Sequence, residues 1–185
     1  RFTALREAGA NVHQMVRAVA SPSVLYAVEC IGISNAALHQ VRCAAAKACS
    51  AKAAGKNIDM IWASIDGSCG NADPAFEAHA GPIKYWALAL CEAWFPNGCL
   101  DDLLAKAKLK LKCSDRSFWA RVSGTATALV ATLSRLCWKW ASNDVLLDDV
   151  GNELFFGLDP PNAFVPPAKA SVRHWRLNRI LKMFF

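Results

Sequence analysis

The feature that most constrains the fold of this chain is a helical pattern between residues 15 and 42 that helix-start signals interrupt at two points. Apolar residues recur at helical spacing through the stretch, and Ser21-Pro22 and the Gly-x-Ser-Asn sequence from Gly32 divide it. Proline is favoured in the first turn of a helix, and serine is a preferred N-cap. The stretch therefore predicts three helical pieces in succession, with a new start at Ser21-Pro22 and another after Ser34.

Composition and periodicity extend the helical prediction to most of the chain. Hydrophobic residues make up 54% and charged residues 19%, which argues against disorder, and alanine, the best helix former, supplies much of the apolar total. Residues 143–159 differ, because two short apolar runs there flank an Asp-Asp-Val-Gly-Asn turn sequence. We expect a mainly α fold, an irregular multi-helix bundle with one small β-hairpin near residues 144–157.

Three consecutive segments are predicted. Residues 1–56 form a thumb-like helical segment, and residues 57–142 continue the same core with further helices. Residues 143–185 contain the hairpin, a Pro-rich linker and a basic C-terminal helix.

Local signals predict where individual helices begin and break. Asn57 is placed to cap a short helix that runs to Ile65, and Asp73-Pro74 has the order of an N-cap followed by a first helical residue. Gly81-Pro82 predicts a kink or a restart. The prolines between residues 160 and 167 predict a stiff linker before the final helix, which is expected from about Ala168.

Basic segments are the strongest functional signal in a chain with a formal net charge of +6. The final helix places Lys169, Arg173 and Arg176 at spacing for one face, and no acid follows Lys169. An acid-free, Arg-rich helix suits contact with phosphates, whereas the alternative is a solvated face or one that docks on an acidic patch of another domain. The candidate nucleic-acid-binding residues are Arg42, Lys47, Lys52, Lys169, Arg173, Arg176 and Arg179.

Catalytic and metal sites find little support. Adjacent aspartates on a hairpin hold Mg²⁺ in polymerases, but Leu146 stands where an aromatic residue opens that motif, so Asp148-Asp149 is better explained as turn chemistry. An acid–base pair of His79 and Glu77 is a weaker enzymatic hypothesis. The eight cysteines form no C-x-x-C pair, which favours reduced and mostly buried thiols over zinc. We predict no catalytic and no metal-binding residue in this segment.

One stretch resembles the thumb region that follows the palm in reverse transcriptases of LINE-type (non-LTR) retrotransposons. In that family a helix leads to a p-x-x-L-Y-G-x-E element, and then to s-x-x-x-L-x-x-x-R. The first element is matched here around Tyr26, with Ala27 in place of the glycine. The matching residues are Pro22, Leu25, Tyr26, Ala27, Glu29, Ser34, Leu38 and Arg42.

The resemblance implies a non-catalytic part of an RNA-directed DNA polymerase that grips the template–primer by its backbone. Its partners would be RNA or an RNA–DNA duplex and the upstream palm domain of the same polyprotein, where the Mg²⁺ would be held, with no membrane involved. A location in the nucleus or cytoplasm follows, and a start at Arg1 is expected of a fragment. The alternatives are a non-enzymatic helical module that binds protein through Trp-rich faces, or a decayed remnant of such an element.

Overall fold

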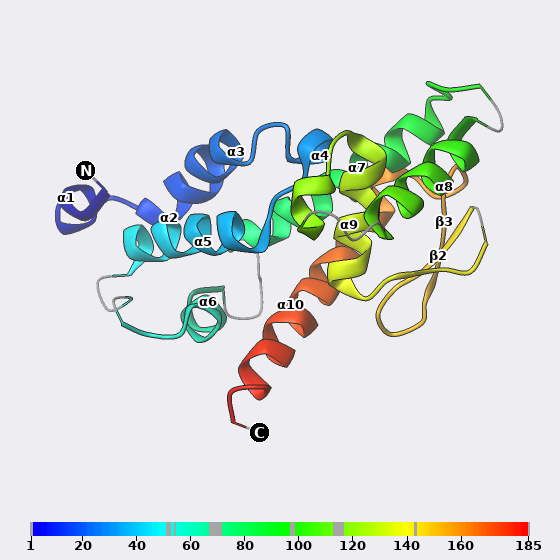
Figure 1. Ribbon diagram of the computed structural model, residues 1–185. Helices are drawn as coiled ribbons and strands as arrows, with labels where there is room; N and C mark the ends of the chain where they lie inside the picture. Colours follow the sequence, from blue (N-terminus) through cyan, green and yellow to red (C-terminus); the bar gives the residue numbers. More distant parts are fainter. Residues whose placement is uncertain are drawn as a thin grey trace. The chain divides into compact units, whose positions relative to one another are not determined.

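The computed structural model describes residues 2–50, 53, 55–66, 72–96, 99–112, 117–142 and 144–184 (Figure 1). The fold is mainly helical with a small antiparallel sheet, so the predicted fold class is confirmed. The chain divides into two compact units, each assembled from separate stretches rather than from consecutive segments. The first unit comprises Arg1–Tyr26, Ser34–Glu77 and Val172–Phe185, and the second unit comprises Ala27–Ile33 and Ala78–Ser171.

Helix α5 (Asn35–Cys49) is the central element of the first unit, drawn in cyan in Figure 1. Residues from α1, α2, η1, α3 and α6 all lie against it. The unit also contains the beginning of α7 and the C-terminal half of α10. The bounds of these elements are α1 Phe2–Glu7, α2 Val12–Met15, the π-turn η1 Val16–Ala20, α3 Ser21–Val24, α6 Ile58–Asp66, α7 Pro74–Cys91 and α10 Val165–Leu181.

The helix starts predicted from local sequence in the first unit are confirmed at three positions where a side chain caps the helix. The Ser34 hydroxyl accepts the Ala37 N–H at 3.1 Å, which satisfies a donor that α5 leaves unpaired in its first turn. Asn57 Oδ1 caps α6 by accepting N–H groups from Asp59 at 2.9 Å and Met60 at 3.0 Å. Asp73, the N-cap of α7, is described with the site below.

The predicted start at Ser21-Pro22 is confirmed, since α3 begins at Ser21 with Pro22 in its first turn, but the backbone before it is already helical and the run continues from α2 through η1 into α3. The residue before Ser21 keeps helical dihedral angles, with φ −68° and ψ −44°. Pro22 has no N–H to donate, so it would break an ordinary α-helical ladder at this point. The π-turn accommodates it, since the Ser21 N–H bonds to the Val16 carbonyl, five residues earlier.

The core of the first unit forms around Trp62, which is fully buried between α5 and α6. Its indole N–H donates to the Arg42 carbonyl at 3.3 Å, so the one polar atom of this side chain is satisfied. A second apolar cluster joins Val12 and Val16 to Ala48, near the C-terminal end of α5. Ala45 and Cys49 of α5 pack against both clusters.

The second unit is built around α9 (Thr125–Leu136), which packs against α4 (Val28–Ile31) and α8 (Cys99–Lys112). The apolar side of α9 is buried, including Leu129 and Leu133. Two 3₁₀ turns complete the helical part, η3 at Phe118–Arg121 and η4 at Pro161–Phe164.

A three-stranded antiparallel sheet with the order β1-β2-β3 lies in the second unit. The predicted hairpin corresponds to β2 (Val145–Leu147) and β3 (Glu153–Phe155), in which Leu146 faces Leu154. Strand β1 (Lys139–Trp140) adds to its edge, with Trp140 opposite Leu146.

Two predictions near prolines differ from the structure: no new helix starts at Gly81-Pro82, and the residues expected to form a linker are helical. Helix α7 continues through Pro82, because the preceding Gly81 has no Cβ to clash with the ring and the buried residues Ile83 and Trp86 hold the helix in place. The prolines expected to form a linker instead occupy η4 and the first turn of α10, which begins at Val165, where the missing N–H groups need no partner.

Candidate nucleic-acid interface

Charge is divided unequally between the two units. The first unit contains eleven Lys and Arg residues against five Asp and Glu residues, whereas the second unit contains ten of each. The formal net charge of +6 therefore belongs to the first unit alone. A concentrated basic excess of this kind attracts polyanions.

Arg42, a predicted site residue on α5, lies in the interior with 1% of its surface exposed. Its Nε donates to Asp73 Oδ1 at 2.9 Å and its Nη2 donates to Asp73 Oδ2 at 2.8 Å, which is the bidentate geometry that Arg favours. Its Nη1 donates to Asp59 Oδ1 at 2.6 Å. Arg42 therefore joins the start of α6 to the start of α7.

Two arginines of α10 complete this group of charges. Arg176 Nη1 donates to Asp66 Oδ2 at 2.6 Å and to Asp73 Oδ2 at 3.2 Å. Arg179 Nε donates to Asp59 Oδ2 at 2.9 Å, although 45% of the Arg179 side chain is exposed. We call this set the buried ion cluster: Arg42, Arg176, Arg179, Asp59, Asp66 and Asp73.

The carboxylates of the buried ion cluster lie where helices begin and end, so backbone groups also bind them. Asp73 Oδ1 accepts the Ala75 N–H at 2.9 Å as the N-cap of α7, and Asp66 Oδ1 accepts the Ala72 N–H at 3.0 Å. Burial by itself lowers the pKa of Arg42, but Asp73 and Asp59 raise it by more, so its pKa lies above the ordinary value. The three guanidinium groups and three carboxylates cancel in formal charge.

Aromatic rings cover the guanidinium groups of the cluster. Trp175 lies between two of them, with its ring centroid 5.2 Å from Arg42 Cζ and 5.1 Å from Arg179 Cζ. Phe76 lies 5.2 Å from Arg176 Cζ. These cation–π contacts add to the ion pairs of the cluster.

Most of the charged residues of the first unit that lie outside the buried ion cluster are Lys or Arg. Eight of its eleven Lys and Arg residues remain, against two acids, Glu7 and Glu77, which are both exposed. Internal pairing thus hides three of its five carboxylates and leaves the basic excess outside the cluster.

The structure separates the predicted site residues into three groups. Arg42 and Arg176 are interior and bind carboxylates, so the expected single basic face of the last helix is divided between the core and the surface. Arg179 pairs with Asp59 at the edge of the cluster. Lys47 and Arg173 are exposed, Lys169 is half-buried on the part of α10 that belongs to the second unit, and Lys52 lies outside the described residues.

Other cations of the first unit were not among the predicted residues. Arg17, Lys56 and Lys182 are exposed. Arg6 is half-buried, and its Nη1 donates to the carbonyls of Ala48 at 2.9 Å and Lys47 at 3.2 Å, where the end of α5 leaves acceptors without helical partners. The acid-free stretch between Glu29 and Asp59 was a sequence signal for Lys56 alone, and no periodic basic pattern surrounds Arg6, Arg17 or Lys182.

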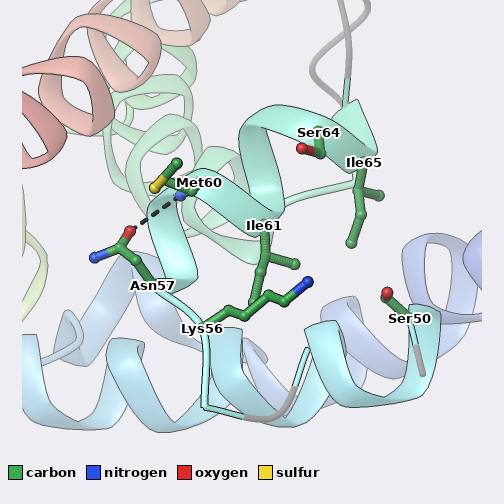
Figure 2. A pocket seen from close by; sticks show the side chains of 7 residues that line it. All are labelled: Ser50, Lys56, Asn57, Met60, Ile61, Ser64 and Ile65. Atoms are coloured by element: carbon green, nitrogen blue, oxygen red, sulfur yellow. Dashed lines mark hydrogen bonds between the residues drawn. The ribbon is translucent and has the colours of Figure 1, made fainter. Parts of the chain in front are cut away.

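A groove in the first unit, shown in Figure 2, lies beside α6 and has a volume of about 510 Å³. Met60, Ile61 and Ile65 supply apolar surface, and Lys56 is the one charged residue among the described residues of the lining. The lining residues among those that the structure describes are Ser50, Lys56, Asn57, Met60, Ile61, Ser64 and Ile65.

The hairpin aspartates of the second unit bind the surrounding loop. Asp148 accepts N–H groups from Val150 at 3.0 Å and from the backbone of Asn152 at 2.8 Å, and the Asn152 side-chain amide donates to it at 2.8 Å. Asp149 accepts the hydroxyl of Ser171, which in turn accepts the Trp138 indole N–H. The predicted turn chemistry of Asp148 is confirmed.

The hypothetical acid–base pair on α7 is not assembled. His79 is fully buried with its Nε2 3.4 Å from Arg135 Nη1, whereas Glu77 is exposed. Two residues apart on a helix, the side chains point to different sides.

Thiols and other metal-binding side chains are dispersed in the described part of the chain. Six cysteines there are free, and the prediction that most are buried is wrong, because Cys91, Cys99 and Cys137 are exposed and the others are half-buried. No group of three or more His, Cys, Asp or Glu residues suited to a metal ion occurs among the described residues. Comparison of the chain with protein-family models, curated proteins and solved structures finds no match.

Proposed function

We propose that the first unit binds the phosphate backbone of an RNA–DNA duplex, as a non-catalytic part of an RNA-directed DNA polymerase. The observation that carries the proposal is the separation of charge, which puts the entire net charge of +6 on this unit and pairs three of its five acids internally. The resemblance of residues 22–42 to a LINE-type thumb supplies the kind of polymer. The proposed partners are therefore RNA or the duplex and an upstream palm domain, in the nucleus or cytoplasm.

Phosphate contact predicts a steep dependence of affinity on salt. Each Lys or Arg that neutralises a phosphate releases condensed counterions, so the slope of log affinity against log salt changes by about 0.9 per contact on B-form duplex. Binding through apolar faces lacks this signature.

None of the described helices combines the length and hydropathy needed to cross a bilayer.

The test is fluorescence anisotropy of a labelled, blunt RNA–DNA duplex over a series of salt concentrations. We expect Arg17→Gln with Lys47→Gln to reduce the magnitude of the slope by one to two, since both residues are exposed on the first unit. The matched control is Lys106→Gln with Lys112→Gln, two exposed cations on α8 of the neutral second unit. Absence of affinity at low salt, or an equal effect of the control pair, contradicts the proposal.

The alternative of a protein-interaction module depends on exposed tryptophan. Trp62, Trp86 and Trp138 are buried, with at most 4% of their surfaces exposed, so these three pack the interior instead of offering a docking face. Trp94, at 44% exposure, is the tryptophan that most favours this alternative in the described part of the chain. Salt-insensitive binding of a protein partner that Trp94→Ala abolishes would support it.

A further inference from the structure

The groove beside α6 combines apolar surface with hydrogen-bonding groups and a single cation. We propose that it receives one unpaired nucleotide of the bound nucleic acid, an inference that rests on the proposed function and assigns a ligand to one part of the first unit. Its volume of about 510 Å³ falls within the roughly 300–1,000 Å³ that is common for small-molecule sites.

The lining matches the two chemical parts of a nucleotide. The aliphatic side chains of Met60, Ile61 and Ile65 offer a surface for the apolar face of a base. Ser64 and the Asn57 amide offer hydrogen-bonding groups for a base edge or a ribose 2′-hydroxyl. Lys56 supplies the positive charge for a phosphate at the same groove (Figure 2).

Further cations lie next to residues of the lining. Asn57 Nδ2 donates to Met183 Sδ at 2.9 Å, which brings the segment containing Lys182 next to Asn57. Arg6 binds the carbonyl of Ala48, two residues before Ser50 of the lining. A nucleotide in a chain carries a phosphate on each side, and among the described residues these two hydrogen bonds connect Lys182 to Asn57 through Met183 and Arg6 to Ser50 through Ala48.

Carboxylates of α6 do not oppose an anion in the groove. Helix α6 contains two acids, Asp59 and Asp66, and both are buried and paired with arginines of the buried ion cluster. Neither belongs to the groove lining. The same helix thus presents neutral groups to the groove and its negative charges to the core.

The other large hollow described in the first unit lacks these features. It has a volume of about 400 Å³ and lies beside α5, and among its described lining residues Ser21 and Gln40 are polar and none is charged. An anion would lose its hydration there without a compensating charge. The groove beside α6 is therefore the better nucleotide site.

The experiment compares a blunt RNA–DNA duplex with the same duplex carrying a short single-stranded RNA overhang. We expect the wild-type chain to bind the overhang form about tenfold more tightly, the order expected for one base packed against side chains. Ser64→Trp fills the groove from an exposed position of α6 and should abolish this preference while leaving blunt-duplex affinity unchanged. The matched control is Ser142→Trp, at an exposed position of the second unit.

Photo-crosslinking locates the unpaired nucleotide independently. An overhang that contains 4-thiouridine should crosslink to the peptide that spans Lys56–Ile65, and Lys56→Gln should weaken that crosslink more than Lys56→Arg. The nucleotide site is overturned if the preference is absent, if Ser64→Trp preserves it, or if crosslinks map elsewhere, although blunt-duplex binding would still support the proposed function. Loss of all duplex binding at low salt would instead refute the proposed function and the nucleotide site together.

Discussion

Replacing Arg42 with alanine should cost the chain much of its stability, because three of its nitrogen atoms bind buried carboxylates. The substitution removes the bonds to Asp73 at 2.8 and 2.9 Å and the bond to Asp59 at 2.6 Å. Removing one partner of a buried ion pair costs about 3–5 kcal/mol, since the remaining charge stays desolvated. In the Arg42→Ala variant, Asp59 still pairs with Arg179 and Asp73 still pairs with Arg176. We therefore expect the free energy of unfolding to fall by about 3 kcal/mol, near the lower end of that range.

Arg179→Ala is the matched control, because it removes an arginine from the same cluster at its edge. The Arg179 side chain is 45% exposed, and Asp59 still pairs with Arg42 when Arg179 is removed. The free energy of unfolding should therefore fall by less than about 1 kcal/mol. Arg42→Lys should fall between the two, because lysine keeps the charge and loses the bidentate contact.

Urea unfolding followed by circular dichroism measures these differences. We expect the midpoint to shift while the slope of the free energy of unfolding against urea stays constant. Equal losses for Arg42→Ala and Arg179→Ala would refute the reasoning that burial sets the energy of these ion pairs.

Three further outcomes follow from single positions. Gly32→Ala should destabilise the second unit by about 2 kcal/mol in urea unfolding, since Gly32 has φ +63° and an added Cβ would lie 3.0 Å from Val122 Cγ1. Burial raises the pKa of Asp148, but the hydrogen bonds to its carboxylate lower that pKa by more, so the pKa lies below the ordinary value. The stability that the ionised Asp148 adds is therefore present above about pH 4 and is lost as the pH falls further. Asp148→Asn should flatten this acid limb in a plot of the free energy of unfolding against pH. Burial, with a smaller contribution from Asp66, raises the pKa of Cys49 to about 11, so iodoacetamide at pH 8 should alkylate exposed Cys91 well before Cys49, as read by peptide mass spectrometry.

Local signals predicted the helix starts that depend on neighbouring residues. Ser34 and Asn57 cap their helices through side-chain oxygens two or three residues from the N–H groups they accept, a distance that the sequence displays directly. The hairpin was predicted for the same reason, because its turn and flanking apolar runs are contiguous. The prolines between residues 160 and 167 were predicted to form a linker, whereas they begin η4 and α10, where Phe164 and Ala168 are buried. Burial of this kind depends on tertiary contacts that the local sequence does not display.

The candidate site was less predictable, because its decisive contacts join distant residues. The predicted residues Arg42 and Arg176 are basic in a basic chain, and nothing near them in sequence indicates burial. Asp73 lies 31 residues from Arg42 and 103 from Arg176. Capping predicted Asp73 as a helix start, but its second role as a carboxylate shared by two arginines was missed.

The sequence by itself determined the helical class of this protein, the position of its hairpin and its overall positive charge, because propensity, capping and composition are properties of short segments or of sums. The tertiary structure decided which charges remain outside the core. Only folding brings Asp59, Asp66 and Asp73 against arginines of α5 and α10, and a buried carboxylate without a cation costs too much to persist. That pairing hides the acids and leaves a basic surface from which a polyanion partner is inferred.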